Sequence, residues 1–294
     1  MEIFHAVILG IIEGITEFLP ISSTGHLILS SHALDLEQTD FLKTFEISIQ
    51  LGAILSVVVL YWRKLLVNFE IIKRIALAFI PTGILGLAFY KIVKTYLMES
   101  QLVIVASLFI GGIILILFEV WYEKKKKLKR DPSVPQDDSV VSADSSSIPQ
   151  NDPNTTSTNV SGYGASSDDV EDISYKNSVL IGIFQSIAMI PGVSRSGATI
   201  VGGLSLGLSR KTIVEFSFLL AVPTMVAATG LDLFKNAGSF NQDQFGILAV
   251  GFIISFFIAL LSIKWLLKFI KNHSFIWFGV YRIVISILFF LVIF

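Results

Sequence analysis

The sequence predicts an all-α integral membrane protein in which six transmembrane helices and two re-entrant helix-loop-helix hairpins form an inverted-topology repeat. Of its 294 residues, 53% are hydrophobic and only 15% are charged, and the mean hydropathy is +0.74. A soluble domain of this size carries a larger charged fraction on its surface. Two short polar segments that resemble each other, one in each half of the chain, are the further observation behind this fold class.

Six apolar stretches are long enough to cross a hydrocarbon core about 30 Å thick. A charge at the bilayer centre costs roughly 2.5 to 3.5 kcal/mol on the insertion scale, and most charged residues accordingly lie between these stretches. The few ionisable residues inside apolar segments are therefore candidates for function. The predicted spans lie near 44–62, 75–92, 102–122, 212–232, 245–267 and 275–294.

Two Pro-broken segments, near 3–31 and 178–206, are too polar at their centres to be simple spans. An offset of 172 residues aligns them and places Ser22 over Ser194. Each has an apolar start, a Pro, a cluster of Ser, Thr and Gly, and a second apolar stretch, which is the pattern of a broken helix. Non-helical backbone at membrane depth is tolerated only where it is buried in protein or lines a wet cavity. Two broken helices in corresponding places therefore predict a shared site near the bilayer midplane.

One hairpin and three spans in each half give the halves opposite orientations. A second match, at an offset of 169, aligns Glu46 with Glu215 and supports the duplication. In this arrangement Lys and Arg gather on one side, most densely at 124–130, and the positive-inside rule makes that side cytoplasmic. We therefore expect the hairpin at 3–31 to enter from the outside and the hairpin at 178–206 from the cytoplasm.

These boundaries divide the chain into membrane repeat A at 1–130, a linker at 131–174 and membrane repeat B at 175–294. The linker is rich in Ser, Asp, Asn, Pro and Thr and has almost no large apolar residues. Such a segment buries too little apolar surface to offset its chain entropy. The sequence predicts a disordered cytoplasmic linker, most simply a tolerated insertion.

Composition also excludes some chemistry. The formal net charge of −1 provides no field that would attract nucleic acid, so no nucleic-acid partner is expected. Cys is absent from the sequence, which excludes disulfides, thiolate nucleophiles and cysteine-ligated metals.

Glu13 and Glu17 are spaced one helical turn apart, so both carboxylates project from one face. Two acids this close in a low-dielectric site share a proton, hold a metal or have a basic partner. Ser23 and His26 follow after the break at Pro20, within reach of the same cavity. A lone intramembrane Ser usually makes a helix-to-helix hydrogen bond, but two acids near the midplane are costly without a function. We expect Glu13, Glu17, Ser23 and His26 to act together.

Arg195 lies in the segment PGVSRSGAT of the second broken helix. It is either the partner of a buried carboxylate or a planar two-pronged donor to a phosphate. Gly, Ser and Thr at a helix start offer free N–H groups and the positive end of the helix dipole, which together bind anions and favour the second alternative. Acids and a His opposite an arginine and an anion site are suited to phosphoryl transfer. The predicted phosphate-binding residues are Ser22, Thr24, Ser194, Ser196, Gly197 and Thr199.

These motifs resemble the bacterial undecaprenyl-diphosphate phosphatase family, also called the bacitracin-resistance family. The resemblance rests on EGITEFLPISSTGH, KTFEISIQLGA, PGVSRSGAT, EFSFLLAVP and VYR, in this order, and covers 1–125 and 176–294. It implies hydrolysis of undecaprenyl diphosphate to undecaprenyl phosphate and inorganic phosphate, which recycles the lipid carrier for peptidoglycan and other envelope glycans and confers bacitracin resistance. It also implies a multi-pass protein of the bacterial inner membrane, a site open toward the periplasmic side, and a divalent cation, Mg²⁺ or Ca²⁺, as cofactor.

The resemblance places the family's acidic motif on Glu13 and Glu17, its Ser and His on Ser23 and His26, and its arginine on Arg195. Two mechanisms stay open. Ser23 attacks phosphorus with His26 or Glu17 as base, or a water attacks while Ser23 orients the phosphate. Glu13 and Glu17 are the predicted metal ligands, and Glu13 is the preferred contact because hard oxygen ligands suit Mg²⁺ or Ca²⁺.

The main alternative function is a polyprenyl-phosphate flippase or secondary transporter, since inverted repeats around broken helices are typical of that class. Transport alone requires no His and no paired acids beside an arginine, whereas hydrolysis uses all of them. A purely structural subunit does not explain so many polar groups at the midplane. The expected partners are the polyprenyl diphosphate lipid, the membrane and a second copy of the chain in a homodimer. Arg282, in the last span, is either a packing or snorkelling residue or a second headgroup contact.

Overall fold

The computed structural model describes residues 1–37, 39–97, 100–128, 169–236 and 244–293. Throughout these ranges the secondary structure is helical, without a strand. Six of the described helices are long and apolar enough to cross a membrane, which confirms the predicted all-α fold of a multi-pass membrane protein. They are α3 (Asp40–Leu66), α4 (Phe69–Ile92), α5 (Gln101–Leu128), α8 (Arg210–Asn236), α9 (Phe245–Phe269) and α10 (Ile276–Ile293).

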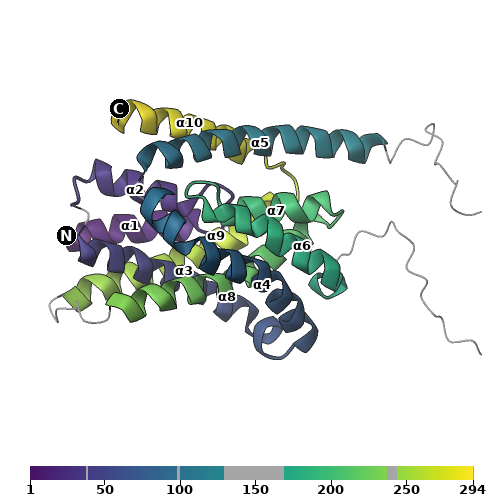
Figure 1. Ribbon diagram of the computed structural model, residues 1–294, viewed down its shortest axis with the longest axis horizontal. Helices are drawn as coiled ribbons and strands as arrows, with labels where there is room; N and C mark the ends of the chain where they lie inside the picture. Colours follow the sequence, from purple (N-terminus) through teal and green to yellow (C-terminus); the bar gives the residue numbers. More distant parts are fainter. Residues whose placement is uncertain (38, 98–99, 129–168, 237–243, 294) are drawn as a thin grey trace, which may run out of the picture.

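The two Pro-broken segments form helix-loop-helix hairpins, as the sequence predicts. Hairpin A consists of α1 (Ile3–Thr16) and α2 (Ser23–Ala33). Hairpin B consists of α6 (Tyr175–Ser186), the short 3-10 helix η3 (Ile187–Met189) and α7 (Arg195–Ser205). In Figure 1 hairpin A lies to the left and hairpin B to the right, and the long helices pack around them. The re-entrant course of the hairpins, from opposite sides of the bilayer, stays a prediction.

The loop of each hairpin contains a Pro, and a Ser is the N-cap of the helix that follows it. Pro donates no main-chain hydrogen bond and disfavours helix in the residue before it. Ser22 and Ser194 are the N-caps of α2 and α7, with φ of 70° and 76° and ψ of 94° and 113°. A positive φ in a residue that has a Cβ atom costs about 1–3 kcal/mol, so surrounding contacts must hold both loops in place. The same uncommon geometry at aligned positions supports the internal repeat.

The two repeats interlock because each hairpin packs against a helix of the other half. Helix α1 lies along α9, α6 lies along α4, and the last long helices, α5 and α10, pair with each other (Figure 1). At Gly10 a Cβ atom would lie 2.8 Å from the carbonyl oxygen of Gly251, and at Gly182 it would collide with the main chain of Ala78. Since the repeat offset aligns Gly10 with Gly182, one close helix-helix approach occurs twice. This doubled contact supports an internal repeat, and the opposite orientation of its halves stays a prediction.

The predicted linker at 131–174 lies outside the described residues as far as residue 168. Its last residues form the 3-10 helix η2 (Val170–Asp172), which lies against α4 and α8. Both Val170 and Ile173 are fully buried in the main hydrophobic core. The packed part of repeat B therefore begins before the boundary that the sequence predicts.

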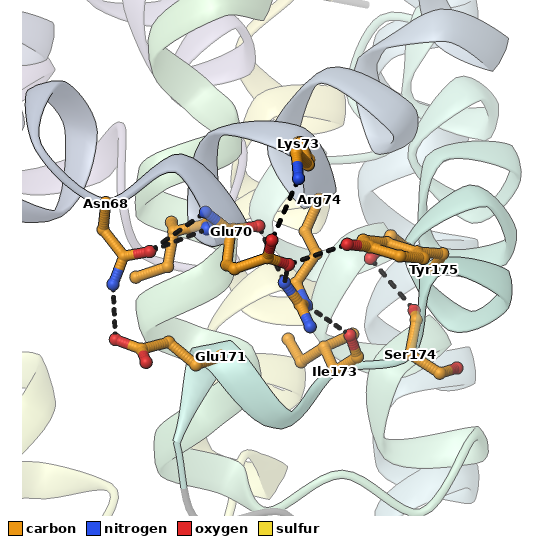
Figure 2. A network of polar contacts seen from close by, with 10 residues as sticks. Asn68, Glu70, Lys73, Arg74, Glu171, Ile173, Ser174 and Tyr175 are labelled. Atoms are coloured by element: carbon orange, nitrogen blue, oxygen red, sulfur yellow. Dashed lines mark hydrogen bonds and ion pairs between the residues drawn. The ribbon is translucent and has the colours of Figure 1, made fainter.

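Polar contacts fasten this segment to the first turns of α4 (Figure 2). Arg74 Nε donates to the carbonyl oxygen of Ile173 at 2.6 Å, and Arg74 Nη1 donates to the Glu70 carboxylate at 2.8 Å. The Tyr175 hydroxyl donates to the same carboxylate at 2.7 Å. The start of hairpin B is thus held by repeat A. Further contacts in this network involve Asn68, Lys73 and Glu171.

We expect Ile173→Ala to lower the free energy of unfolding by about 2–5 kcal/mol, because it removes a buried side chain from a packed core. The loss should appear as a lower apparent unfolding temperature of the purified protein in detergent. Ile183→Ala makes the same truncation on α6 at a residue that is 49% exposed, and it serves as the control. Equal losses in the two variants would contradict a packed role for η2.

Candidate active site between the hairpins

A cavity of about 190 Å³ lies where the loops of the two hairpins meet. Both repeats contribute to its wall, as expected for a site shared between two broken helices. Hairpin A contributes Glu17, Ser22, Ser23 and Thr24. Hairpin B contributes Gln185, Ala188, Met189, Pro191, Gly192, Ser194 and Arg195, and the long helices contribute Gln50, Thr82, Thr224 and Met225.

The carboxylate of Glu17 joins the two hairpins. Its Oε2 accepts from the Ser23 hydroxyl at 2.6 Å, and its Oε1 accepts from Arg195 Nη2 at 2.7 Å. Glu17 is only 7% exposed, so bulk water screens these contacts little, and charge-assisted hydrogen bonds in such surroundings are strong. Three of the four predicted catalytic residues therefore meet in one cluster.

Arg195 is the partner of a buried carboxylate, which was one of the two alternatives from the sequence. Its Nη1 also donates to the carbonyl oxygen of Ser217 at 3.0 Å, and the two contacts fix the plane of the guanidinium. Its Nε–H is buried and has no hydrogen-bond partner among the described residues. Because an unpaired buried donor is costly, this N–H favours an anionic ligand. Phosphate binding by Arg195 stays a prediction that this observation supports.

His26 lies in the first turn of α2 and is not among the residues that line the cavity. Its Nδ1 lies 2.8 Å from the carbonyl oxygen of Ser22 and its Nε2 lies 2.8 Å from the hydroxyl of Tyr281. A carbonyl only accepts, so Nδ1 carries the hydrogen, and in the neutral ring Nε2 accepts from Tyr281. Of the two bases that the sequence left open for Ser23, only Glu17 contacts its hydroxyl.

Glu13 is completely buried beside the cluster. Neither of its carboxylate oxygens accepts a hydrogen bond from an N–H or hydroxyl donor among the described residues. Its side chain meets the Glu17 carboxylate, with which it could share a proton, and Glu46 and Arg195 are further charged neighbours. A buried carboxylate without hydrogen bonds calls for a proton or a cation. Within the described ranges no group of three His, Cys, Asp or Glu side chains is arranged to hold a metal. A cation at Glu13 would therefore need further oxygen ligands from substrate or water.

The predicted phosphate-binding residues divide into two groups. Ser196 bridges the hairpins, because its Oγ donates to the carbonyl oxygen of Leu19 at 2.8 Å. Gly197 and Thr199 form hydrogen bonds at the start of α7 and do not line the cavity. These three residues shape the loop. The cavity is lined by Ser22, Thr24 and Ser194.

Gln185 is a cavity residue that the sequence analysis did not assign to the site. Its Nε2 donates to Thr82 at 3.0 Å and to Thr224 at 3.1 Å, and its Oε1 has no partner among the described residues. The repeat offset aligns Gln185 with Glu13. Because Glu13 is a predicted site residue, this alignment could have identified Gln185 as a cavity residue from the sequence. Tyr281 belongs to the VYR motif, for which the sequence predicted no role of the Tyr. Its contact with His26 joins α10 to hairpin A.

A family model described as bacitracin resistance protein BacA matches residues 6–288. The chain belongs to the bacitracin resistance protein BacA family. The chain is 49% identical to the undecaprenyl-diphosphatase of Aquifex aeolicus over 289 residues, which cover 98% of each chain. It is 50% identical over 291 residues to the protein of that name from Sulfurihydrogenibium sp., with 99% of each chain covered. For the Wolinella succinogenes protein of that name, identity is 46% over 98% of this chain and 97% of the relative.

The BacA match confirms the resemblance inferred from the motifs. It covers most of hairpin A, all of hairpin B and most of α10, and every predicted site residue and Arg282 lie inside it. These relatives match 98% and 99% of this chain, and their name specifies an enzyme that acts on undecaprenyl diphosphate.

We expect Arg195→Lys to be nearly as damaging as Arg195→Ala, with about 10²–10³-fold slower turnover in both. Lys keeps the charge but has no planar guanidinium to hold Glu17, Ser217 and a ligand together. The measurement is phosphate release from undecaprenyl diphosphate, the compound in the relatives' name. Arg63→Lys, at a residue whose guanidinium stacks on Trp62, is the control. Turnover like the wild type in Arg195→Lys would show that only the charge matters.

Proposed function

We propose that this chain is an undecaprenyl-diphosphate phosphatase. It hydrolyses undecaprenyl diphosphate to undecaprenyl phosphate and inorganic phosphate, recycles the lipid carrier for peptidoglycan and other envelope glycans, and confers bacitracin resistance. The observation that carries the proposal is the Glu17 carboxylate, which accepts from Ser23 and from Arg195 at the wall of one cavity. A hydroxyl, a base and a cation in contact are the groups that phosphoryl transfer requires.

The contact between Ser23 and Glu17 favours Ser23 as nucleophile. As Ser23 Oγ forms a bond to the terminal phosphorus, its proton passes to Glu17 and the phosphoanhydride bond breaks, which releases undecaprenyl phosphate. Water then hydrolyses the phosphoserine and inorganic phosphate leaves. Arg195 orients the carboxylate and neutralises charge on the transferring group. In the alternative, a water attacks directly and Ser23 orients the phosphate.

A divalent cation, Mg²⁺ or Ca²⁺, belongs to the proposal. The unpaired carboxylate of Glu13 fits a hard cation, and Glu17, one helical turn further on, is the second predicted ligand. Such a cation would neutralise charge on the diphosphate oxygens. The oxygens of Glu17 already accept from Ser23 and Arg195, so Glu13 is the stronger candidate for the metal contact.

A second cavity supports a lipid substrate. It is apolar, has a volume of about 560 Å³ and lies between hairpin A and helices α9 and α10. Tyr281 lines it and also contacts His26 of hairpin A, so an apolar surface runs up to the back of the site. Burial of an isoprenoid chain there would contribute roughly 25 cal/mol for each Å² removed from water. The residues that line this cavity are Ile15, Thr16, Leu19, Ile21, Trp265, Phe269, His273, Trp277, Phe278 and Tyr281.

The proposal places the enzyme in the bacterial inner membrane, with the site open toward the periplasmic side. The positive-inside rule supports this orientation, because Arg63, Lys64 and Lys73 lie near the junction of α3 and α4 and three lysines lie in the last turn of α5. Association as a homodimer stays a prediction.

The test is phosphate release from undecaprenyl diphosphate by the purified full-length chain in detergent, with and without EDTA. We expect release that EDTA suppresses and added Mg²⁺ or Ca²⁺ restores, because the unpaired Glu13 carboxylate needs a cation beside the diphosphate. Ser23→Ala, which removes only the hydroxyl, should reduce the rate by at least about 10²-fold. Well-folded protein that releases no phosphate but moves polyprenyl phosphate across vesicle membranes would support the flippase or transporter alternative instead.

The acid pair gives a second prediction. Glu17→Gln should remove most activity, since an amide cannot take the Ser23 proton. Glu13→Gln should mainly raise the metal concentration needed, because an amide keeps one weak oxygen ligand. Metal titrations of both variants separate these roles. Complete loss in Glu13→Gln at saturating metal, with only a shifted metal requirement in Glu17→Gln, would exchange the two assignments.

A further inference from the structure

Arg282 lies inside α10 and is only 2% exposed. Its guanidinium has five N–H groups, and each of them meets a main-chain carbonyl oxygen. Nε donates to Leu108 at 3.3 Å and Nη2 to Ser107 at 3.1 Å, both on α5. The other three hydrogen bonds reach the hairpin loops. They are Nη1 to Pro20 at 3.4 Å, Nη1 to Val193 at 2.8 Å and Nη2 to Gly192 at 2.8 Å.

These contacts decide between the alternatives that the sequence left open for Arg282. A snorkelling side chain keeps its charged end in water, whereas this one is buried. A headgroup contact requires a free N–H, and all five are used within the protein. No carboxylate among the described residues pairs with Arg282. Carbonyl dipoles alone compensate the buried charge. The guanidinium therefore serves to hold the main chain in position.

The surrounding backbone is shaped to receive the guanidinium. A Cβ atom at Gly111 would collide with Arg282 Nη2. Gly192 has a φ of +91°, and a Cβ there would lie 2.6 Å from the carbonyl oxygen of Ile104 on α5. Glycine on α5 makes room for the side chain, and glycine in hairpin B lets its loop approach α5 closely.

The carbonyls that Arg282 holds adjoin the candidate active site. Val193 immediately precedes Ser194 and Arg195, and Pro20 stands three residues before Ser23. Both loops contain a Ser at positive φ, a conformation that persists only where surrounding contacts impose it. The contact of Glu17 with Ser23 and Arg195 depends on the relative position of the two loops, and Arg282 bonds to the main chain of both.

We propose that Arg282 is a positioning residue that fixes the loops of hairpins A and B relative to each other, so that Ser23 and Arg195 both reach Glu17. Its kinetic consequence rests on the proposed phosphatase activity, whereas its effect on the loops does not. A displacement of about 1 Å at a catalytic group costs up to about 10²-fold in rate.

The kinetic test uses Arg282→Met, Arg282→Lys and Gly111→Ala. Met matches the apolar stem without donors, Lys offers at most three donors, and Ala at 111 displaces the guanidinium while Arg282 stays. We expect kcat for phosphate release to fall about 10²-fold in Arg282→Met and less in the other two, with KM changed by under about threefold. Gly83→Ala is the control, because its Cβ would meet only Phe79 at 3.6 Å. Unchanged kcat in Arg282→Met, or an effect confined to KM, would overturn the proposal.

The second test reads the loop itself. The chain has no Cys, so Ile190→Cys in the loop of hairpin B, 39% exposed, accepts a single nitroxide label. Its mobility should increase when Arg282→Met is added. A label at Ile253→Cys on α9, 52% exposed, should not respond. No change at 190, or equal change at both sites, would overturn the proposal. If the label becomes more mobile in Arg282→Met but the chain with Arg282 intact releases no phosphate, Arg282 remains the loop anchor and the phosphatase activity is rejected.

Discussion

The two helix breaks leave main-chain groups without helical partners, and in an apolar medium each such group costs several kcal/mol unless another donor or acceptor meets it. Side chains from elsewhere in the fold provide these partners. Arg282 covers carbonyls of both loops, and Ser196 of hairpin B covers the carbonyl of Leu19 in hairpin A. Main-chain carbonyls of each loop thus accept hydrogen bonds from the other hairpin or from α10. The loops are therefore stable only when they face each other. The cavity between them follows from that requirement.

The same requirement accounts for the polarity of the site. Burying a charged carboxylate such as Glu17 among apolar helices costs free energy. Hydrogen bonds of 2.7 Å or less from Arg195 and Ser23 offset this cost. Removing one partner would destabilise the protein more than the intact pair stabilises it, because a buried charge would be left unpaired. The geometry of the candidate site and the stability of the fold therefore depend on the same contacts. Glu13 accepts no hydrogen bond from a donor group within the described residues, and it meets the Glu17 carboxylate. Such a pair of acids holds a shared proton or a cation.

The sequence predicted the elements better than the contacts. Hydropathy sufficed for the six long helices, and a Pro followed by Ser and Gly sufficed for each break, because these are local properties. The sequence also predicted Ser194, Ser196 and Thr199 as phosphate ligands. Which of these hydroxyls faces the cavity depends on the tertiary structure around the start of α7, and the Ser196 hydroxyl donates to Leu19 instead. The role of Arg282 was equally hidden, since its partners are main-chain carbonyls, which every residue has. The buried η2 turn carried too few apolar residues to stand out from the polar segment before it.

The internal repeat shows where the two halves diverge in chemistry. The offset of 172 that aligns Ser22 with Ser194 also aligns Ser23 with Arg195. These are the first residues of α2 and α7, and both hydrogen-bond to Glu17. Equivalent positions in the repeat thus carry a hydroxyl, the proposed nucleophile, on one side and a cationic donor on the other. Duplication explains why two helix starts converge on one point. The difference between their first side chains is what gives that point the unlike groups that phosphoryl transfer requires.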